Sequence, residues 1–332
     1  MKKRPTGKIE NDDNYRSIGK PVQSSSSGER VDRYLAKNFP FYSRAEWQKK
    51  IREGTLIVNS LSVEPAYKIK EGDELHIYRP ITEEPEVDRG IEVIWEEKGV
   101  MAVFKPSSLP MHESGPYRKN TFFSLVKEKF GDEWASVHRL DHETSGIVIC
   151  GNTHYIRDNL SRQWASRDVK KEYLAIVRGS PESNYFLESG PIGDLKESAI
   201  RIKKWVVTGG LSAQTFFEVL EKKEGFSLLK AIPKTGRTNQ IRIHAAYNGF
   251  PLVGDKLYNP DENVFLEYFE KKKLTDSILE KTGFHRLCLH ASRLELTHPI
   301  TQKRCVIECE MAPDMKAFWK AIAIDFQSSH LI

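Results

Sequence analysis

The chain has 332 residues, of which 39% are hydrophobic, and its formal net charge at pH 7 is +5. This length suggests roughly two globular domains. The sequence contains no run of about 18 apolar residues, the length needed to span a membrane. Its polar N-terminus also lacks the apolar stretch of a secretory signal. Four cysteines in a chain this long make no disulfide framework, so we expect a reducing cytoplasm. The positive charge favours a polyanionic partner.

The first part of the chain changes character near residue 29. Residues 1–28 are polar and end in SSSSG, a composition typical of a disordered tail. Residues 29–79 contain two helical patterns, the second beginning at the N-cap Ser43 and ending at Gly54. Two short strand patterns, TLIVNS and ELHIY, follow them. The order predicts a small α/β domain over residues 29–79.

The two helices of this domain are basic. Between Glu29 and Arg52 they carry seven basic and three acidic residues, a net charge of +4. A compact helix pair with one basic face can bind the RNA backbone. The same charge also fits an ordinary solvated helix surface. The candidate RNA contacts are Arg30, Arg33, Arg44, Lys49 and Lys50.

The rest of the chain predicts a second, larger domain. Residues 80–90 combine two prolines with acidic residues and are expected to be a linker. Over residues 91–325, strand patterns outnumber helical ones and often follow one another directly. This arrangement predicts an α+β domain with a mixed, largely antiparallel sheet rather than a doubly wound fold. Residues 261–284 form a charged, helix-prone insert.

Residues 138–146 read HRLDHETSG and precede a β-branched run, so they are expected to form a loop before a buried strand. Asp141, in the middle of the loop, is either a turn-former or a catalytic carboxylate. The loop lacks the glutamate of HExxH, and the chain has no GxSxG, GxGxxG or GxxxxGKS/T motif. We therefore expect neither a metal nor a cofactor.

A second polar stretch, residues 225–254, is basic and contains no acidic residue. One interpretation is a surface that faces phosphates. The other places an arginine inward against a buried carboxylate, where it would hold the acid in orientation. The basic residues of this stretch are Lys230, Lys234, Arg237, Arg242 and His244.

The loop HRLDHETSG resembles the signature HRLDxxTSG of the RluA family of pseudouridine synthases. The segments KPSSLPMH, KKEYLAIVRG, KTGRTNQIRIH, GDKLYN and LHASRLELTHP resemble further family motifs in the same order and extend the resemblance over about residues 91–312. RVDRYLAKNFPFYSRAEWQKKIREGTLIVN resembles the alpha-L RNA-binding module. One position departs from the family, because Asn239 stands where the third motif usually has histidine.

The resemblance implies a catalytic domain of the pseudouridine synthase type and a role for each matching residue. Asp141 matches the essential aspartate, Tyr173 the tyrosine that lies against the target uracil, and Arg242 the basic residue that pairs with the aspartate. Arg139 matches the arginine that enters the space left by the flipped base. Lys234 and Arg237 are expected to contact RNA. Whether the aspartate attacks C1′ or removes a sugar proton stays open.

We therefore expect a cytoplasmic, monomeric RNA pseudouridine synthase that acts without a cofactor and does not bind membranes. The accessory module is common in the ribosomal branch of the family, which favours large-subunit ribosomal RNA over tRNA as substrate. The alternative is a non-catalytic RNA-binding protein of ribosome assembly.

Overall fold

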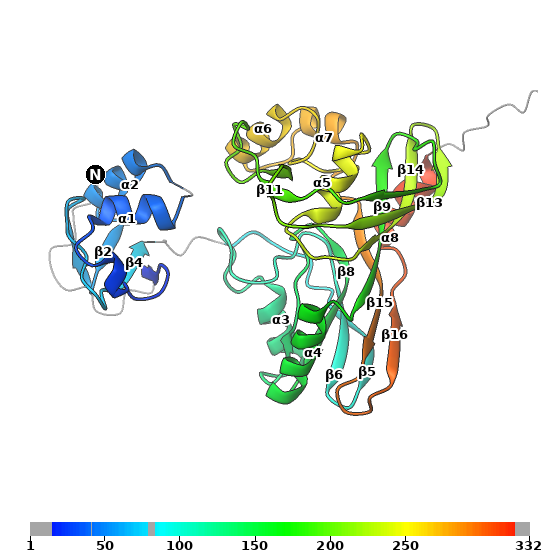
Figure 1. Ribbon diagram of the computed structural model, residues 1–332, viewed down its shortest axis with the longest axis horizontal. Helices are drawn as coiled ribbons and strands as arrows, with labels where there is room; N and C mark the ends of the chain where they lie inside the picture. Colours follow the sequence, from blue (N-terminus) through cyan, green and yellow to red (C-terminus); the bar gives the residue numbers. More distant parts are fainter. Residues whose placement is uncertain (1–14, 41, 79–83, 323–332) are drawn as a thin grey trace, which may run out of the picture. The chain divides into compact units, whose positions relative to one another are not determined.

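The structure, a computed structural model, describes residues 15–40, 42–78 and 84–322 and divides into two compact units (Figure 1). The division falls after residue 83, within the expected linker. The described part of that linker, residues 84–90, belongs to the larger unit: the Glu84 carboxylate accepts the backbone N–H groups of Lys119 and Asn120. None of the described helices is long and apolar enough to cross a membrane.

The smaller unit is a four-stranded antiparallel sheet in the order β1-β4-β2-β3, packed against two helices. The helix α2 begins as predicted, with a capping box between Ser43 and Glu46. Trp47 and Leu35, from the two helices, are fully buried in its core. The elements are β1 (Tyr15–Ser17), α1 (Val31–Asn38), α2 (Arg44–Arg52), β2 (Leu56–Val58), β3 (Leu61–Ser62) and β4 (Leu75–Tyr78).

The disordered tail expected over residues 1–28 is wrong for its second half. Tyr15–Ser17 pairs with β4, and the next apolar residues, Ile18 and Val22, are only 6% and 2% exposed. Two apolar side chains and a strand pairing are enough to attach a segment whose composition is otherwise polar. Residues 1–14 lie outside the described residues.

The larger unit contains a ten-stranded sheet, in the order β10-β13-β14-β9-β15-β8-β6-β5, with β16 beside β15 and β7 beside β8. All pairings are antiparallel except that of β15 with β8, so the mixed, largely antiparallel sheet is confirmed. Its strands are β5 (Glu92–Glu97), β6 (Val100–Lys105), β7 (Ala135–Ser136), β8 (Ser145–Gly151), β9 (Lys170–Arg178), β10 (Tyr185–Glu188), β13 (Thr215–Lys223), β14 (Phe226–Pro233), β15 (Leu289–Thr297) and β16 (Arg304–Glu308).

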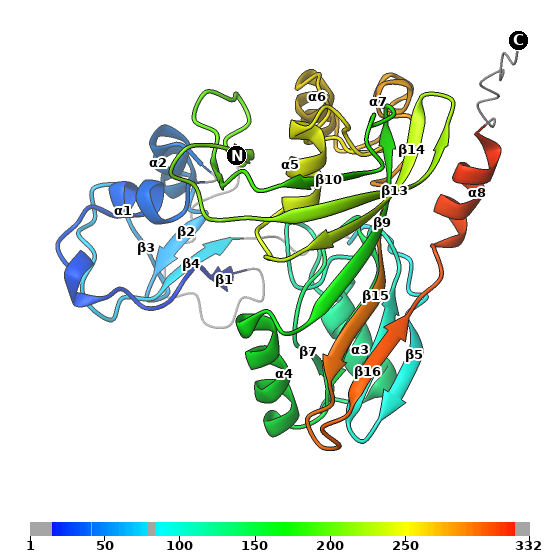
Figure 2. The ribbon, with the colours of Figure 1, turned by 45° about the vertical axis from the view of Figure 1, so that its right-hand side comes forward.

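Helices pack on this sheet, and β9 and β15 run side by side through its middle (Figure 2). Threonine N-caps begin three of the helices: Thr121, Thr153 and Thr275. The insert over 261–284 contains two of the helices, α6 and α7. The remaining elements are α3 (Phe122–Phe130), α4 (His154–Ser166), β11 (Ile192–Asp194), β12 (Lys204–Val206), α5 (Gln240–Tyr247), α6 (Asn263–Lys271), α7 (Asp276–Thr282) and α8 (Pro313–Ala321).

The parallel contact between β8 and β15 is short and very close. It joins Ser145 to His290 and Gly146 to Ala291. Gly146 has φ +115°, and a Cβ there would meet the backbone of Ala291, so only glycine fits. The contact brings the loop that precedes β8 into the middle of the sheet, beside β9.

Candidate active site

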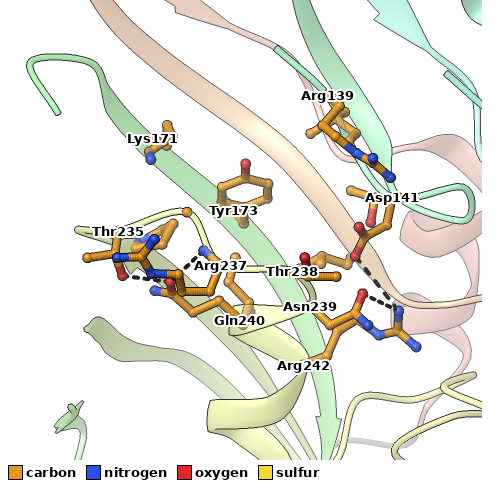
Figure 3. A pocket seen from close by; sticks show the side chains of 16 residues that line it. Arg139, Asp141, Lys171, Tyr173, Thr235, Arg237, Thr238, Asn239, Gln240 and Arg242 are labelled. Carbon is orange, nitrogen blue, oxygen red and sulfur yellow. Dashed lines mark hydrogen bonds and ion pairs between the residues drawn. The ribbon is translucent and has the colours of Figure 1, made fainter. Parts of the chain in front are cut away.

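A cavity of about 230 Å³ opens between the loop 138–144 and the segment 233–242 (Figure 3). This volume is several times the roughly 30 Å³ that a water molecule takes in the liquid. The loop before β8, the strand β9 and the start of α5 all contribute to its lining. Among the lining residues are Arg139, Asp141, Lys171, Tyr173, Arg237, Thr238, Asn239 and Arg242.

Asp141 has two separate functions in the loop. Its backbone carbonyl accepts the N–H of Thr144 at 3.1 Å and so closes a turn. Its side chain, 28% exposed, lines the cavity, with Oδ2 3.7 Å from Nη1 of Arg242. This distance is short enough for an ion pair but longer than a hydrogen bond. The turn-former and the cavity carboxylate are therefore the same residue.

Arg242 is only 14% exposed and lies between two carboxylates. Its Nε and Nη2 donate to Asp255 at 2.7 and 2.8 Å, and its Nη1 donates to Oδ1 of Asn239 at 3.0 Å. Burial opposes its charge, but Asp255 and then Asp141 outweigh burial and raise the pKa of Arg242. The arginine points inward, as one interpretation of the basic stretch proposed, but its tighter partner is Asp255, for which no role was predicted.

Tyr173 and Lys171 stand two residues apart on β9 and both line the cavity. Burial and then the charge of Asp141 raise the pKa of Tyr173, so the phenol stays neutral at physiological pH. Burial also lowers the pKa of Lys171. No role was predicted for Lys171, because a lysine doublet at a strand end resembles ordinary surface charge. An aromatic face beside a cation suits a nucleobase and its phosphate.

Lys105, at the end of β6, binds the backbone of the loop. Its side chain is fully buried, and Nζ donates to the carbonyls of Pro106, His142 and Thr144 at 2.8, 3.0 and 2.8 Å. Burial lowers the pKa of Lys105 to about 7. This lysine is the first residue of the motif KPSSLPMH, and no role was predicted for it. Because two of its acceptors lie one and three residues after Asp141, Lys105 fixes the loop that carries the carboxylate.

The two histidines of HRLDH connect the loop to its neighbours. His138 Nε2 accepts the backbone N–H of Ile149 at 3.0 Å, and its ring stacks on Trp164 with 4.4 Å between centroids. Burial lowers the pKa of His138 to about 3. The His142 ring lies 2.9 Å from the carbonyl of Ser108. Both imidazoles therefore serve the local structure.

The expected RNA contacts of the larger unit lie in or near the cavity. Arg139 and Arg237 line it, and Arg237 also donates from Nε to the carbonyl of Ser212 at 3.0 Å. Lys234 is exposed at the end of β14 but does not line the cavity.

In the smaller unit, two of the five expected RNA contacts are committed to an internal acid. Arg30 and Arg44 donate to Asp32, which is fully buried. Burial raises the pKa of Asp32, but the hydrogen bonds of Arg30, Gln48 and Arg44 outweigh burial and lower it. The other three behave as surface cations. Arg33 and Lys49 are exposed, and Nζ of Lys50 lies 4.5 Å from the ring centroid of Tyr42.

A family model and several known proteins match this chain. The family model for RNA pseudouridylate synthase matches residues 99–247, which include the loop, β9 and α5. Ribosomal large subunit pseudouridine synthase D from Blochmanniella floridana is 33% identical over 85% of this chain and 90% of its own. Ribosomal large subunit pseudouridine synthase C from Escherichia coli (strain K12) is 28% identical over 89% and 93%.

The fold also has solved relatives. The structure of human RNA Pseudouridylate Synthase Domain Containing 1 superposes with a TM-score of 0.56 at 21% identity, covering 71% of this chain and 90% of that one. The identity and coverage of the sequence relatives, together with the family model over the cavity, show that the chain belongs to the RNA pseudouridine synthase family and is an isomerase.

Proposed function

We propose that this enzyme converts specific uridines of large-subunit ribosomal RNA to pseudouridine, with Asp141 as the carboxylate that reacts at the sugar. The observation that carries the proposal is the position of Asp141: its carboxylate lines the cavity, 3.7 Å from Arg242 and beside Tyr173. The names of the sequence relatives support ribosomal RNA as the substrate.

The reaction fits the residues that are present. The C1′–N1 bond of uridine breaks, the uracil turns, and a C1′–C5 bond forms. The hydrogen on C5 leaves as a proton while N1 gains one, so the isomerisation is redox-neutral and uses no phosphate energy. Asp141 either adds to C1′ or removes a sugar proton, and both steps require an ionised carboxylate. Arg242 places a positive charge 3.7 Å from this carboxylate.

Recognition in this proposal separates the base from the backbone. The target uracil leaves the stack at a cost of about a few kcal/mol. Arg139 fills the space that it leaves, and Tyr173 offers a flat face to it in the cavity. Lys234 and Arg237 contact phosphates at the cavity entrance. The smaller unit supplies further phosphate contacts through Arg33, Lys49 and Lys50, with Arg30 and Arg44 adding charge to the same surface.

Two measurements test the proposal. RNA with uridine tritiated at C5 releases tritium as the C1′–C5 bond forms, so transcripts of large-subunit ribosomal RNA and of tRNA can be compared directly. Wild-type enzyme is expected to release tritium from the ribosomal transcript, and Asp141→Asn to release it at least about a hundredfold more slowly. Pseudouridine maps of total RNA with and without the gene then identify the site. Release from tRNA alone would contradict the ribosomal assignment, and an active Asp141→Asn enzyme would contradict the role of Asp141.

A further inference from the structure

Asp255 is a buried acid whose two oxygens are fully used. Its side chain is completely buried, and both oxygens accept from the guanidinium of Arg242. Oδ1 also accepts the backbone N–H groups of Leu257 and Tyr258, each at 2.9 Å. Burial raises the pKa of Asp255, but Arg242 and these N–H groups outweigh burial and lower it. Asp255 therefore stays ionised beside the arginine.

The donors of Arg242 show what this contact achieves. A guanidinium is planar and has five N–H donors in a fixed fork. Two of them go to Asp255 and one to Asn239. These three bonds determine the orientation of the group, and Nη1 then lies 3.7 Å from Asp141.

Asn239 is itself held in place. Its backbone has φ +56° at the N-terminus of α5, a left-handed conformation that asparagine tolerates well. Its side-chain Nδ2 donates to the hydroxyl of Tyr258 at 3.2 Å, and the Tyr258 ring centroid lies 5.0 Å from Cζ of Arg242. The departure from the family motif thus keeps an acceptor for Arg242 at this position.

We propose that Asp255, helped by Asn239, is a positioning residue that holds Arg242 just beyond hydrogen-bond distance of the reacting carboxylate. A free arginine would close on Asp141 in a two-pronged pair and occupy both of its oxygens. Because the paired Nε and Nη2 donors of Arg242 bind Asp255 instead, the charge of Arg242 stays near Asp141 while an oxygen of Asp141 remains available to the sugar. The inference rests on the proposed roles of Asp141 and Arg242.

The test is Asp255→Asn in the full-length enzyme, measured as the single-turnover rate at saturating RNA and, separately, as RNA affinity. The substitution keeps the shape of the side chain and removes the negative charge that binds the guanidinium of Arg242. The expected rate falls about a hundredfold, as for a misplaced reacting group, while the Kd changes less than about threefold. Asp255→Glu, which keeps the charge, is expected to recover part of the rate. Adding Asp255→Asn to Arg242→Ala is expected to cause no further loss.

A matched control separates positioning from stability. Asp314 forms the same two-pronged pair with the buried Arg286, at 2.8 and 2.5 Å, and neither residue lines the cavity. Asp314→Asn is expected to lower the melting temperature and to leave the rate per folded molecule within about threefold of wild type. If Asp255→Asn does not fold, Asn239→Ala removes the other contact and is expected to slow the rate about tenfold at unchanged affinity.

The outcomes are distinct. A normal rate for both Asp255→Asn and Asn239→Ala, with Arg242→Ala impaired, overturns the positioning role alone. Additive losses in the double variant overturn it as well. An unimpaired Arg242→Ala enzyme shows instead that the proposed role of Arg242 is wrong, and no tritium release by the wild type from any RNA tested contradicts the proposed function itself.

Discussion

Arg242 and Arg237 come from the same segment, KTGRTNQIR, but the fold uses them differently. Arg242 is held by Asp255 and faces Asp141, whereas Arg237 donates to a carbonyl at the partly exposed rim. Arg242→Ala is therefore expected to slow the single-turnover rate by at least about a hundredfold, because it removes a charge beside the reacting carboxylate. Arg237→Ala is expected to weaken RNA binding and to leave the rate at saturation within about threefold.

Single-turnover rates measured at several RNA concentrations separate the effect on the reaction rate from the effect on RNA binding. Arg242→Lys, which keeps the charge but not the fork, is expected to lie between wild type and Arg242→Ala. If Arg242→Ala changed only affinity, Arg242 would be a phosphate contact, and Arg237 would become the better candidate for the site.

We expect Lys105 to make the stability of the larger unit rise with pH. Burial lowers its pKa from 10.5 to about 7, opposed by Asp141 and Glu143, while Arg286 adds to the lowering. Between those values the unfolded chain binds a proton that the folded chain does not, so stability rises with pH. The cost of burying the ammonium is present in full below about pH 7 and is relieved above it.

Unfolding in urea at several pH values measures this contribution. The free energy of unfolding of wild type, relative to Lys105→Met, is expected to rise by roughly 2–3 kcal/mol between pH 7 and pH 9. A constant difference would mean that the three carbonyls keep Lys105 charged throughout. The same variant tests the loop, since it removes the donors that hold the carbonyls of His142 and Thr144.

At this scale, the sequence identified residues whose neighbours form a motif and missed residues whose partners are distant. Asp141, Tyr173 and Arg242 lie in recognisable motifs, and the structure brings them to one cavity. Asp255 was missed because its pairing with Arg242 depends on the path of the chain between them. A signal was nevertheless present: the sequence Leu252-Val253-Gly254 places an acid close behind two apolar residues, and an acid that is buried with them requires a partner.

At the scale of elements, helices were easier to predict than strand partners. The N-cap Ser43 and the apolar spacing of α1 and α2 are local signals, and the structure reproduces both helices. The alternating patterns predicted strands and an antiparallel majority. They could not predict that β8 pairs in parallel with β15, whose first residue follows the last of β8 by more than a hundred positions. Strand pairing depends on the tertiary fold, and the pattern within one strand does not specify its partner.

Gly146 tests how much the parallel contact matters. A Cβ at this position would meet the backbone of Ala291, and φ is +115°. Gly146→Ala is expected to lower the free energy of unfolding by more than the roughly 1–3 kcal/mol of backbone strain alone, because β8 and β15 must also separate. Since the loop of Asp141 enters β8 here, tritium release should fall as well.

The control for Gly146→Ala is Gly225→Ala. Gly225 also has positive φ, +68°, but nothing lies within 4 Å of an added Cβ. It is expected to lose about 1–2 kcal/mol, the ordinary cost of a left-handed residue, with normal activity. Equal losses in urea unfolding for the two variants would mean that the close approach adds nothing beyond strain.

At the scale of the whole molecule, the two units have different roles in the proposed function. The larger unit contains the complete cavity, and the smaller unit contributes a basic surface on which Arg30 and Arg44 are paired with the buried Asp32. The order of helices and strands was enough to predict two domains. The boundary at the N-terminus was misplaced, because a polar composition hides the few apolar residues that attach residues 15–28 to the core.

The contribution of the smaller unit to RNA binding is measurable as a salt dependence. Arg33 and Lys49 are exposed, and no described contact commits them to the core, so Arg33→Ala with Lys49→Ala removes charge without disturbing the fold. Each lost phosphate contact is expected to reduce the slope of log K against log salt by about 0.7 to 0.9. The double variant should therefore bind RNA more weakly at low salt, with a slope smaller by about 1.4 to 1.8.

The control removes the same charge from the larger unit. Lys222, in β13, and Lys320, in α8, are exposed and do not line the cavity. Lys222→Ala with Lys320→Ala equals the first variant in net charge, so a general effect of charge would change both slopes equally. A smaller slope only for Arg33→Ala with Lys49→Ala locates phosphate contacts on the smaller unit. If that slope were unchanged, the smaller unit would make no such contacts through these residues, and its basic helices would be an ordinary solvated surface.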